Sequence, residues 1–237
     1  LVLGEENAGK TSLINRSNQS FSLTAITKAS SRRQHDDPDL AYPVDWWVSD
    51  QAVLIDPPGE IISQSDVPIQ DGELAGEGKS EVAVDEVGSR LPIGTHARLW
   101  DGLVSWLGRN RSRRPLNGVV LIVDIVALLG RGASDRKALA ILLRSRLAEL
   151  SSQLGTRPPL YVVLTKFDQL EGFEPFFARL PRSVREDIFG FTFTLESMDD
   201  FDAWLGELSV GYDSFVSRLN EQVFDALGES SSQEQRE

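Results

Sequence analysis

Apolar residues gather in short continuous runs that predict the strands of a parallel sheet. Three of these runs are Leu1–Leu3, Val119–Val123 and Tyr161–Leu164, and Phe191–Phe193 predicts a further strand. Uninterrupted apolar runs are typical of strands that helices cover on both faces. We therefore expect these segments to form the centre of an α/β domain.

The other apolar residues predict a hairpin and four helices. The hairpin joins Trp46–Val48 to Ala52–Ile55 through a short polar connection. The helices are expected over Lys10–Arg16, Leu99–Leu107, Asp135–Gln153 and Asp200–Leu227. In the longer ones, leucine and aromatic residues recur at helical spacing, so one face of each helix is apolar.

Alternating strands and helices predict a doubly wound α/β fold with a mostly parallel sheet. We expect residues 1–198 to form this domain, residues 199–228 a C-terminal helical extension and residues 229–237 a frayed tail. Residues 60–95 form an insertion in which acids outnumber basic residues, and we expect this insertion to be flexible. Ligands of such sheets bind at the carboxyl ends of the strands.

The composition argues against several classes of site. The formal net charge of −12 repels a phosphate backbone, which argues against nucleic-acid binding. There is no cysteine, and His35 and His96 are isolated, so no thiolate or histidine metal site is expected. A nucleotide pocket stays compatible with this charge because backbone amides and one lysine hold phosphates locally.

No stretch of the sequence predicts a signal peptide or a membrane span. The longest apolar stretch, Val119–Leu129, is interrupted by Asp124 and is too short to cross a bilayer. The sequence begins at Leu1 without a methionine and inside an expected strand. We therefore expect it to be a segment of a longer protein, about whose membrane spans this stretch says nothing.

The first chemical motif follows the first expected strand. Gly4-Glu5-Glu6-Asn7-Ala8-Gly9-Lys10-Thr11 matches the P-loop pattern G-x-x-x-x-G-K-[S/T] at every required position. In such loops glycines let backbone N–H groups point at phosphate oxygens, the lysine reaches the β- and γ-phosphates, and the threonine binds Mg²⁺. The residues expected to bind the phosphates and the metal are Gly4, Asn7, Ala8, Gly9, Lys10, Thr11 and Ser12.

Two further motifs follow expected strands. Asp56-Pro57-Pro58-Gly59 reads D-x-x-G, in which Asp56 is expected to hold Mg²⁺ through water and Gly59 to contact a γ-phosphate. Thr165-Lys166-Phe167-Asp168 reads T-K-x-D, the guanine-selecting element of GTPases. There the aspartate accepts hydrogen bonds from the base, and the lysine stem lies along base and ribose. The three motifs stand in the GTPase order, so we expect GTP or ATP as the ligand, with Mg²⁺.

The sequence resembles the cytoplasmic P-loop domain of the TssM (IcmF-like) inner-membrane proteins of bacterial type VI secretion systems. The resemblance covers nearly the whole chain, from Leu1 to about Leu227. Its segments are the P-loop, the Asp45–Asp56 hairpin, Arg114–Val119, Arg144–Leu147, Pro159–Asp168, Gly172-Phe173 and Phe189–Thr192.

This resemblance implies a place in a secretion complex. It implies a parent protein with membrane helices on both sides of the segment and a large periplasmic portion. It implies the membrane partners TssL and TssJ, and contact with baseplate proteins such as TssK. The segment itself is expected at the cytoplasmic face of the bacterial inner membrane.

The D-x-x-G region departs from that of an efficient GTPase. Glu60 stands where a glutamine commonly orients the attacking water, and a carboxylate beside a triphosphate is repelled by it. Pro57 and Pro58 stiffen the loop and remove two N–H donors. We expect slow hydrolysis or none, and no catalytic residue is assigned. The polar loop of residues 17–43 holds further candidates for the nucleotide and its metal, namely Thr24, Thr27, Arg32 and Arg33.

Three functions are open at this point: a nucleotide-binding assembly module, an NTP hydrolase that times assembly, and a scaffold with a vestigial pocket. The intact Lys10 and Asp56 argue against the scaffold, whereas Glu60 argues against the hydrolase. The basic run Arg109–Arg114 is expected to be a solvated helix end, with anionic lipid or an acidic partner as the alternative. Trp46-Trp47 is expected to pack in the core.

Overall fold

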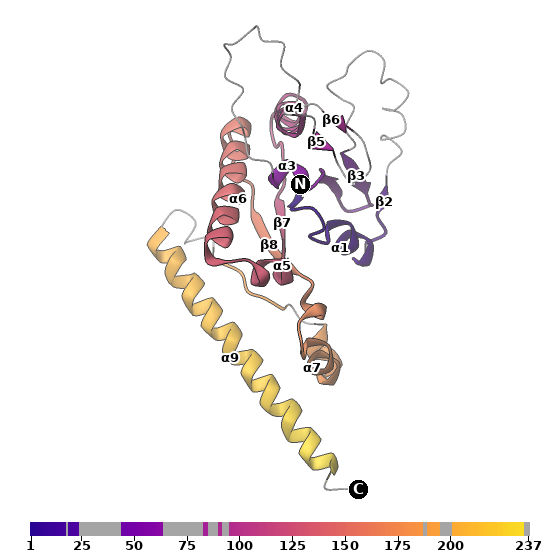
Figure 1. Cartoon of the computed structure of the whole chain (residues 1–237), viewed down its shortest axis with the longest axis vertical. Coiled ribbons are helices and arrows are strands. Elements are labelled where there is room, and N and C mark those ends of the chain that lie inside the picture. Colours follow the sequence, from indigo (N-terminus) through magenta and orange to yellow (C-terminus); the bar gives the residue numbers. More distant parts are fainter. Residues whose placement is uncertain are drawn as a thin grey trace. The chain divides into compact units, whose positions relative to one another are not determined.

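The computed structural model of the chain describes residues 1–17, 19–23, 44–63, 83–84, 90–91, 95–186, 189–194 and 201–234 (Figure 1). The described residues fall into two compact units, Leu1–Lys166 and Phe167–Glu237. Most of the acidic insertion at 60–95 lies outside the described residues. Further expectations that fall outside them concern Thr24, Thr27, Arg32, Arg33 and His35.

A parallel sheet forms the centre of the first unit. Its strands are β1 (Val2–Gly4), β7 (Val119–Asp124) and β8 (Leu160–Thr165), in the order β1-β7-β8. Leu3 lies opposite Leu121, and Val120 opposite Tyr161. The apolar runs Leu1–Leu3, Val119–Val123 and Tyr161–Leu164 therefore form parallel strands as predicted, and the carboxyl ends of these strands lie at one edge.

The predicted hairpin belongs to a second, antiparallel sheet. This sheet has the order β2-β3-β4 and consists of β2 (Ser22–Leu23), β3 (Asp45–Val48) and β4 (Val53–Asp56). A further pair joins β5 (Ala83–Val84) to β6 (Arg90–Leu91). The expectation of one mostly parallel sheet is therefore confirmed in part, because parallel pairing is confined to β1, β7 and β8.

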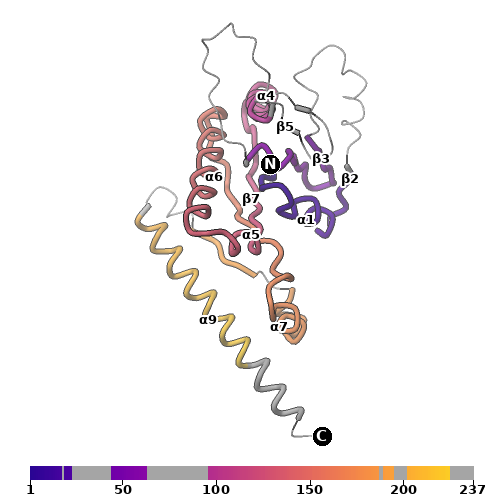
Figure 2. Tube along the Cα trace, viewed as in Figure 1, coloured from indigo at the N-terminus to yellow at the C-terminus, as the bar shows by residue number. Residues whose placement is uncertain are grey.

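Helices of the described part of the first unit connect these strands. They are α1 (Lys10–Arg16), α3 (Glu60–Ser63), α4 (Thr95–Asn110), α5 (Ile125–Gly130) and α6 (Ala133–Leu154). The Cα trace shows these connections for α1, α4, α5 and α6 (Figure 2). Gly155 ends α6 with a φ of 62°, a left-handed conformation that glycine adopts without strain. No described helix is long and apolar enough to cross a membrane.

Alternating side chains of β1 and β7 bury two apolar layers. Leu3 and Leu121 join α4 and α6 in the larger core, whereas Val2 and Ile122 join α1 in the smaller one. The hairpin continues the same two layers, since Ile55 belongs to the larger core and Trp47 to the smaller. Helices thus cover both faces of β1 and β7, as continuous apolar runs predict. The expectation is wrong for β8, in which Tyr161 and Val162 are each 58% exposed.

Polar contacts join α4 to α6 beside the larger core. The carboxylate of Glu149 accepts hydrogen bonds from Trp100 Nε1 at 3.0 Å and Arg146 Nη1 at 2.8 Å. Arg146 is only 4% exposed, so this pairing keeps a buried charge compensated. Trp106 of α4 packs edge-on against Trp46 of β3, with ring centroids 5.5 Å apart. Both tryptophans of the hairpin therefore pack, as expected.

The second unit is built around one long helix and many aromatic rings. It contains a 3₁₀ turn, η2 (Phe167–Gln169), and the helices α7 (Phe173–Arg179), α8 (Arg182–Arg185) and α9 (Phe201–Glu234). Phe189 contacts four other phenylalanines, with ring centroids 5.0 to 6.4 Å apart, and these are Phe167, Phe173, Phe177 and Phe215. Helix α9 continues to Glu234, beyond the end at Leu227 that the sequence predicts.

The strand predicted at Phe191–Phe193 is wrong. Residues 189–194 contain no strand, and their aromatic side chains pack against α9 instead. Phe191 packs against Phe215 and over Gly211, where an added Cβ would lie 2.8 Å from the ring. Phe193 packs on Trp204 with ring centroids 5.4 Å apart. The alternating aromatic residues of this segment therefore pack on the surface of a helix and do not form a strand of a sheet.

Candidate functional site

The P-loop connects β1 to α1 at the carboxyl edge of the parallel sheet. Gly4 sits so close to β7 that an added Cβ would lie 2.9 Å from the backbone oxygen of Ile122. Asn7 and Gly9 have φ values of 58° and 90°, and Ala8 is buried between them. Glycine adopts such a φ readily, whereas asparagine is one of the few other residues that tolerate it. The backbone is therefore turned as a tight loop directly before Lys10.

Lys10 folds back over this loop toward β4. Its Nζ donates a hydrogen bond to the backbone oxygen of Gly4 at 3.3 Å and lies 3.8 Å from Asp56 Oδ1. Asp56 ends β4 and is only 6% exposed. Within the described chain, Asp56 Oδ1 makes no hydrogen bond, although the nearby Trp47 side chain helps to lower the pKa of this carboxyl group. The site thus holds a buried carboxylate oxygen that is available to a cation.

Two carboxylates meet at the open end of the hairpin. Asp45 begins β3 directly opposite Asp56 in the antiparallel register. Burial raises the pKa of Asp56 to about 6, Lys10 opposes this rise, and Asp45 adds to it. Burial also raises the pKa of Asp45. Asp45 belongs to the Asp45–Asp56 hairpin, but sequence reasoning did not place it in the site.

Gly59 lies against the backbone of the P-loop. A Cβ at this position would lie 2.3 Å from the Glu6 nitrogen and 2.6 Å from the Glu5 carbonyl carbon. Glycine is therefore required here by the close approach of two backbones. The next residue, Glu60, begins α3, and Ile62 N donates to Gly59 O at 3.0 Å. The D-x-x-G and P-loop motifs are thus in direct contact.

Thr165 ties the end of β8 to the P-loop. Its hydroxyl donates to the backbone oxygen of Ala8 at 2.6 Å and also lies 3.3 Å from that of Val123. Side-chain atoms of Thr165 also lie 3.7 Å from the Cβ position of Gly9. The first residue of the T-K-x-D motif therefore contacts the backbone of the P-loop at Ala8.

Lys166 is held by an aspartate that sequence reasoning did not assign to the site. Its Nζ lies 2.5 Å from Asp124 Oδ2, and its own φ is 64°. Asp124 also caps α5, because its Oδ1 accepts from the N–H groups of Val126 and Ala127 at 2.9 and 3.0 Å. The hydrogen bonds from Lys166 and the α5 backbone outweigh burial and lower the pKa of Asp124.

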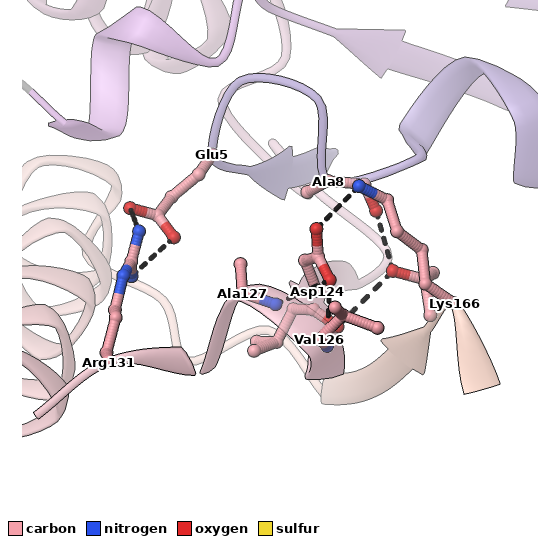
Figure 3. Close-up of polar contacts among 9 residues, drawn as sticks. Glu5, Ala8, Asp124, Val126, Ala127, Arg131 and Lys166 are labelled. Atoms are coloured by element: carbon pink, nitrogen blue, oxygen red, sulfur yellow. Dashed lines mark hydrogen bonds and ion pairs between the residues drawn. The ribbon is translucent and has the colours of Figure 1, made fainter. Parts of the chain in front are cut away.

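Arg131 makes the second contact that the sequence did not predict. It lies between α5 and α6, and its guanidinium binds the Glu5 carboxylate through Nη1–Oε2 at 2.8 Å and Nη2–Oε1 at 3.0 Å. The hydrogen bond to Glu5 raises the pKa of Arg131. Figure 3 shows this pair at the start of the P-loop and the contacts of Ala8, Lys166 and Asp124 near its end.

The structure brings most of the expected site residues together in the first unit. Thr11 and Ser12 are exposed in the first turn of α1, directly after Lys10. Asp168 lies exposed in η2 of the second unit. Sequence signals for the missed residues are weak. Asp124 interrupts an apolar run at a strand end, and Arg131 stands between two glycines.

Comparison with known proteins identifies the family. The profile of the IcmF-related N-terminal domain matches residues 94–237, more than half of the chain. The chain belongs to the IcmF-related family. It is also 32% identical over 234 residues to the "Type VI secretion system component TssM1" of Pseudomonas aeruginosa.

That alignment covers 99% of this chain but 18% of the relative, so the chain spans less than a fifth of the relative's length. No solved structure matches the chain. The IcmF-related match confirms the family resemblance drawn from the motifs and leaves the role of the pocket to be argued from its geometry.

The geometry is suited to an anion and a cation held side by side. Lys10 offers a positive charge at the loop, and Asp56 offers a buried carboxylate oxygen 3.8 Å from that charge. A divalent cation prefers oxygen ligands of this kind, and Mg²⁺ commonly pairs one carboxylate with phosphate oxygens. Among the described residues, Lys10 Nζ also donates to Gly4 O, and Asp56 Oδ1 makes no hydrogen bond.

Proposed function

We propose that this chain is the nucleotide-binding module of an IcmF-related protein in a type VI secretion membrane complex. The module binds GTP or ATP with Mg²⁺ in a P-loop NTPase-like domain. The observation that carries the proposal is the ion pair of Lys10, which lies over the P-loop, with the buried Asp56, whose Oδ1 makes no hydrogen bond among the described residues. A buried polar atom without a hydrogen bond costs stability, and a bound ion is one of the features that account for such an atom in a native structure.

The residues present fit a metal-bound nucleoside triphosphate. Lys10 is released from Gly4 O to reach the phosphates, and the P-loop amides between Gly4 and Ser12 surround them. Thr11 and Asp56 hold Mg²⁺, which neutralises phosphate charge when it is bound. Replacing Lys10 by a metal ion as the neighbour of Asp56 also favours the ionised carboxylate.

Base selection is assigned to the T-K-x-D motif. In this proposal Asp168 accepts hydrogen bonds from the base and Lys166 leaves Asp124 to lie along it. Two groups then exchange partners on binding: Lys10 leaves Asp56, and Lys166 leaves Asp124. Asp168→Asn should therefore exchange GTP affinity for affinity to a xanthosine nucleotide if guanine is selected.

Hydrolysis is the second candidate function, and the D-x-x-G loop argues that it is slow. Pro57 is buried, Gly59 abuts the P-loop backbone, and Glu60 is built into α3. A loop confined in this way offers no placed group that orients water. Phosphate release that disappears in Thr11→Ala would establish a hydrolase in place of a binding module.

By family membership, the proposed setting is the cytoplasmic face of the bacterial inner membrane. The proposed partners there are TssL and TssJ in the membrane complex and baseplate proteins such as TssK. Because the chain spans 18% of the TssM1 of Pseudomonas aeruginosa, these partners belong to the proposal for the parent protein. A nucleotide-independent scaffold is the competing account, and a Lys10→Ala protein that still assembles would favour it.

The deciding experiment is calorimetric titration with GTP and ATP analogues in the presence of Mg²⁺. We expect micromolar binding by the wild-type chain and at least a hundredfold loss in Lys10→Ala, since the lysine is the main charge on the phosphates. Arg144→Ala, at an exposed position of α6, serves as the control and should bind normally. No binding by a folded wild-type chain would refute the proposal and leave the scaffold.

A further inference from the structure

We infer that Arg131 is a positioning residue of the phosphate loop, which neutralises Glu5 so that this loop accepts a polyphosphate. The inference rests on the proposed function and deepens it. It concerns the binding half of the site and assigns Arg131 no contact with the nucleotide. The one contact it uses is the ion pair between Arg131 and Glu5 (Figure 3).

The ion pair has the geometry of a specific contact. Both guanidinium Nη atoms donate to the two carboxylate oxygens, at 2.8 and 3.0 Å, across 126 residues of sequence. A bidentate arginine–carboxylate pair fixes orientation as well as charge. The two side chains are 31% and 23% exposed, so water screens them less than it screens a surface pair. Arg131 lies at the C-terminal end of α5, where Arg136 Nη1 donates to its backbone oxygen.

Glu5 makes this neutralisation necessary. It is the second residue of the P-loop, so its backbone lies where the phosphates are expected. An unpaired carboxylate there repels a polyanion, and the repulsion is strong where water is partly excluded. Glu6 follows directly, and Asp56 already places a buried carboxylate near the loop. Arg131 removes one of these charges and leaves Lys10 free to serve the phosphates.

Two other roles for Arg131 predict different results. If the pair only braces the loop, the loss of either partner should weaken binding equally, because each loss removes the same contact. If Arg131 itself binds phosphate, the loss of Glu5 should leave the need for Arg131 intact. Neutralisation alone predicts that the loss of Arg131 is harmful only while Glu5 keeps its charge.

The experiment is a double-substitution cycle read by calorimetry with the same GTP and ATP analogues and Mg²⁺. The variants are Arg131→Ala, Arg131→Lys, Glu5→Gln and the double variant Glu5→Gln/Arg131→Ala, with Arg144→Ala as the exposed-arginine control. Arg131→Ala should weaken binding roughly tenfold or more at low salt and by less at high salt. Arg131→Lys, which keeps the charge, should bind within about threefold of wild type.

The double variant decides the matter. We expect Glu5→Gln/Arg131→Ala to regain wild-type affinity within about threefold, although it lacks the contact as fully as Arg131→Ala does. Thermal unfolding of both variants supplies a readout that a bracing role would move in parallel with affinity. A double variant as weak as Arg131→Ala overturns the inference, as does an Arg131→Ala protein that binds normally. If the wild-type chain binds neither nucleotide, the proposed function is refuted, and this inference is refuted with it because it depends on nucleotide binding.

Discussion

The two units of the chain are stabilised by different kinds of side chain. The first unit packs aliphatic residues in two layers and buries charged groups, whereas the second packs exposed or half-buried aromatic rings along α9. Among the buried apolar residues of the described chain, Leu180 is the one that belongs to the second unit. Buried charge near the P-loop lowers the stability of the first unit unless a partner compensates it. Among the described residues, the second unit has no buried charged side chain.

Replacing glycine by alanine in each unit tests this difference directly. Gly59→Ala should have the largest effect, because its Cβ would lie 2.3 Å from the Glu6 nitrogen, and a backbone atom cannot yield as a side chain does. We expect the free energy of unfolding to fall by about 3 kcal/mol and nucleotide binding to be lost. Chemical denaturation followed by tryptophan fluorescence reports mainly on this unit, since Trp46, Trp47, Trp100 and Trp106 all lie in it.

The control for Gly59→Ala is Gly102→Ala, a helical position at which an added Cβ meets nothing within 4 Å. It should keep or raise stability, since alanine favours helix. Equal losses in the two variants would contradict the contact between the D-x-x-G and P-loop backbones.

Asp56→Asn should stabilise the nucleotide-free first unit at neutral pH. Because the folded-state pKa of about 6 exceeds the ordinary 3.8, the folded chain binds the proton more tightly than the unfolded chain does. Its stability therefore falls as the pH rises from about 4 to about 6, by about 2 kcal/mol from this group. The asparagine variant should lose most of this dependence while losing metal-dependent nucleotide binding.

Denaturation of wild type and Asp56→Asn at a series of pH values between 4 and 8 measures the effect. Asp45 contributes in the same direction, since burial raises its pKa too, so some dependence on pH should persist in the variant. An Asp56→Asn protein that is less stable than wild type at pH 7 would show that the carboxylate is already compensated.

Gly211→Ala should have the smallest effect and confine it to the second unit. The added Cβ would lie 2.8 Å from the ring of Phe191, but this ring is 38% exposed and has room to shift. We expect Gly211→Ala to be about 1 kcal/mol less stable than Gly206→Ala, a position on α9 where an added Cβ meets nothing.

Hydrogen exchange of α9 and of the first unit, measured in both α9 variants, separates local from global change. Protection should fall in the second unit of Gly211→Ala and stay unchanged in the first. A loss that spreads to the first unit would contradict the division of stability between the two.

Sequence patterns predicted the three parallel strands, the hairpin and the helices α1, α4 and α6 of the first unit, whereas α5 and β2 were not predicted. Motifs with fixed spacing located the P-loop, Asp56 and Thr165, because each lies at the end of a strand with a continuous apolar run. Asp124 and Arg131 were missed because their partners lie 42 and 126 residues away, and only the folded sheet brings them close. The prediction of a strand at Phe191–Phe193 was wrong. Alternation indicates which residues share a face, but it does not show whether that face packs on a sheet or on a helix.

The anchoring of Thr165 has a mechanical consequence. Thr165 and Lys166 are the last residues of the first unit. The Thr165 side chain donates a hydrogen bond to Ala8, and the Lys166 side chain donates one to Asp124. Tension applied to the chain at Phe167, as with an optical trap, therefore acts on these contacts together with the end of β8, to which Thr165 belongs. One of these contacts holds Ala8 of the P-loop, so under the proposed function a bound nucleotide should change the rupture force.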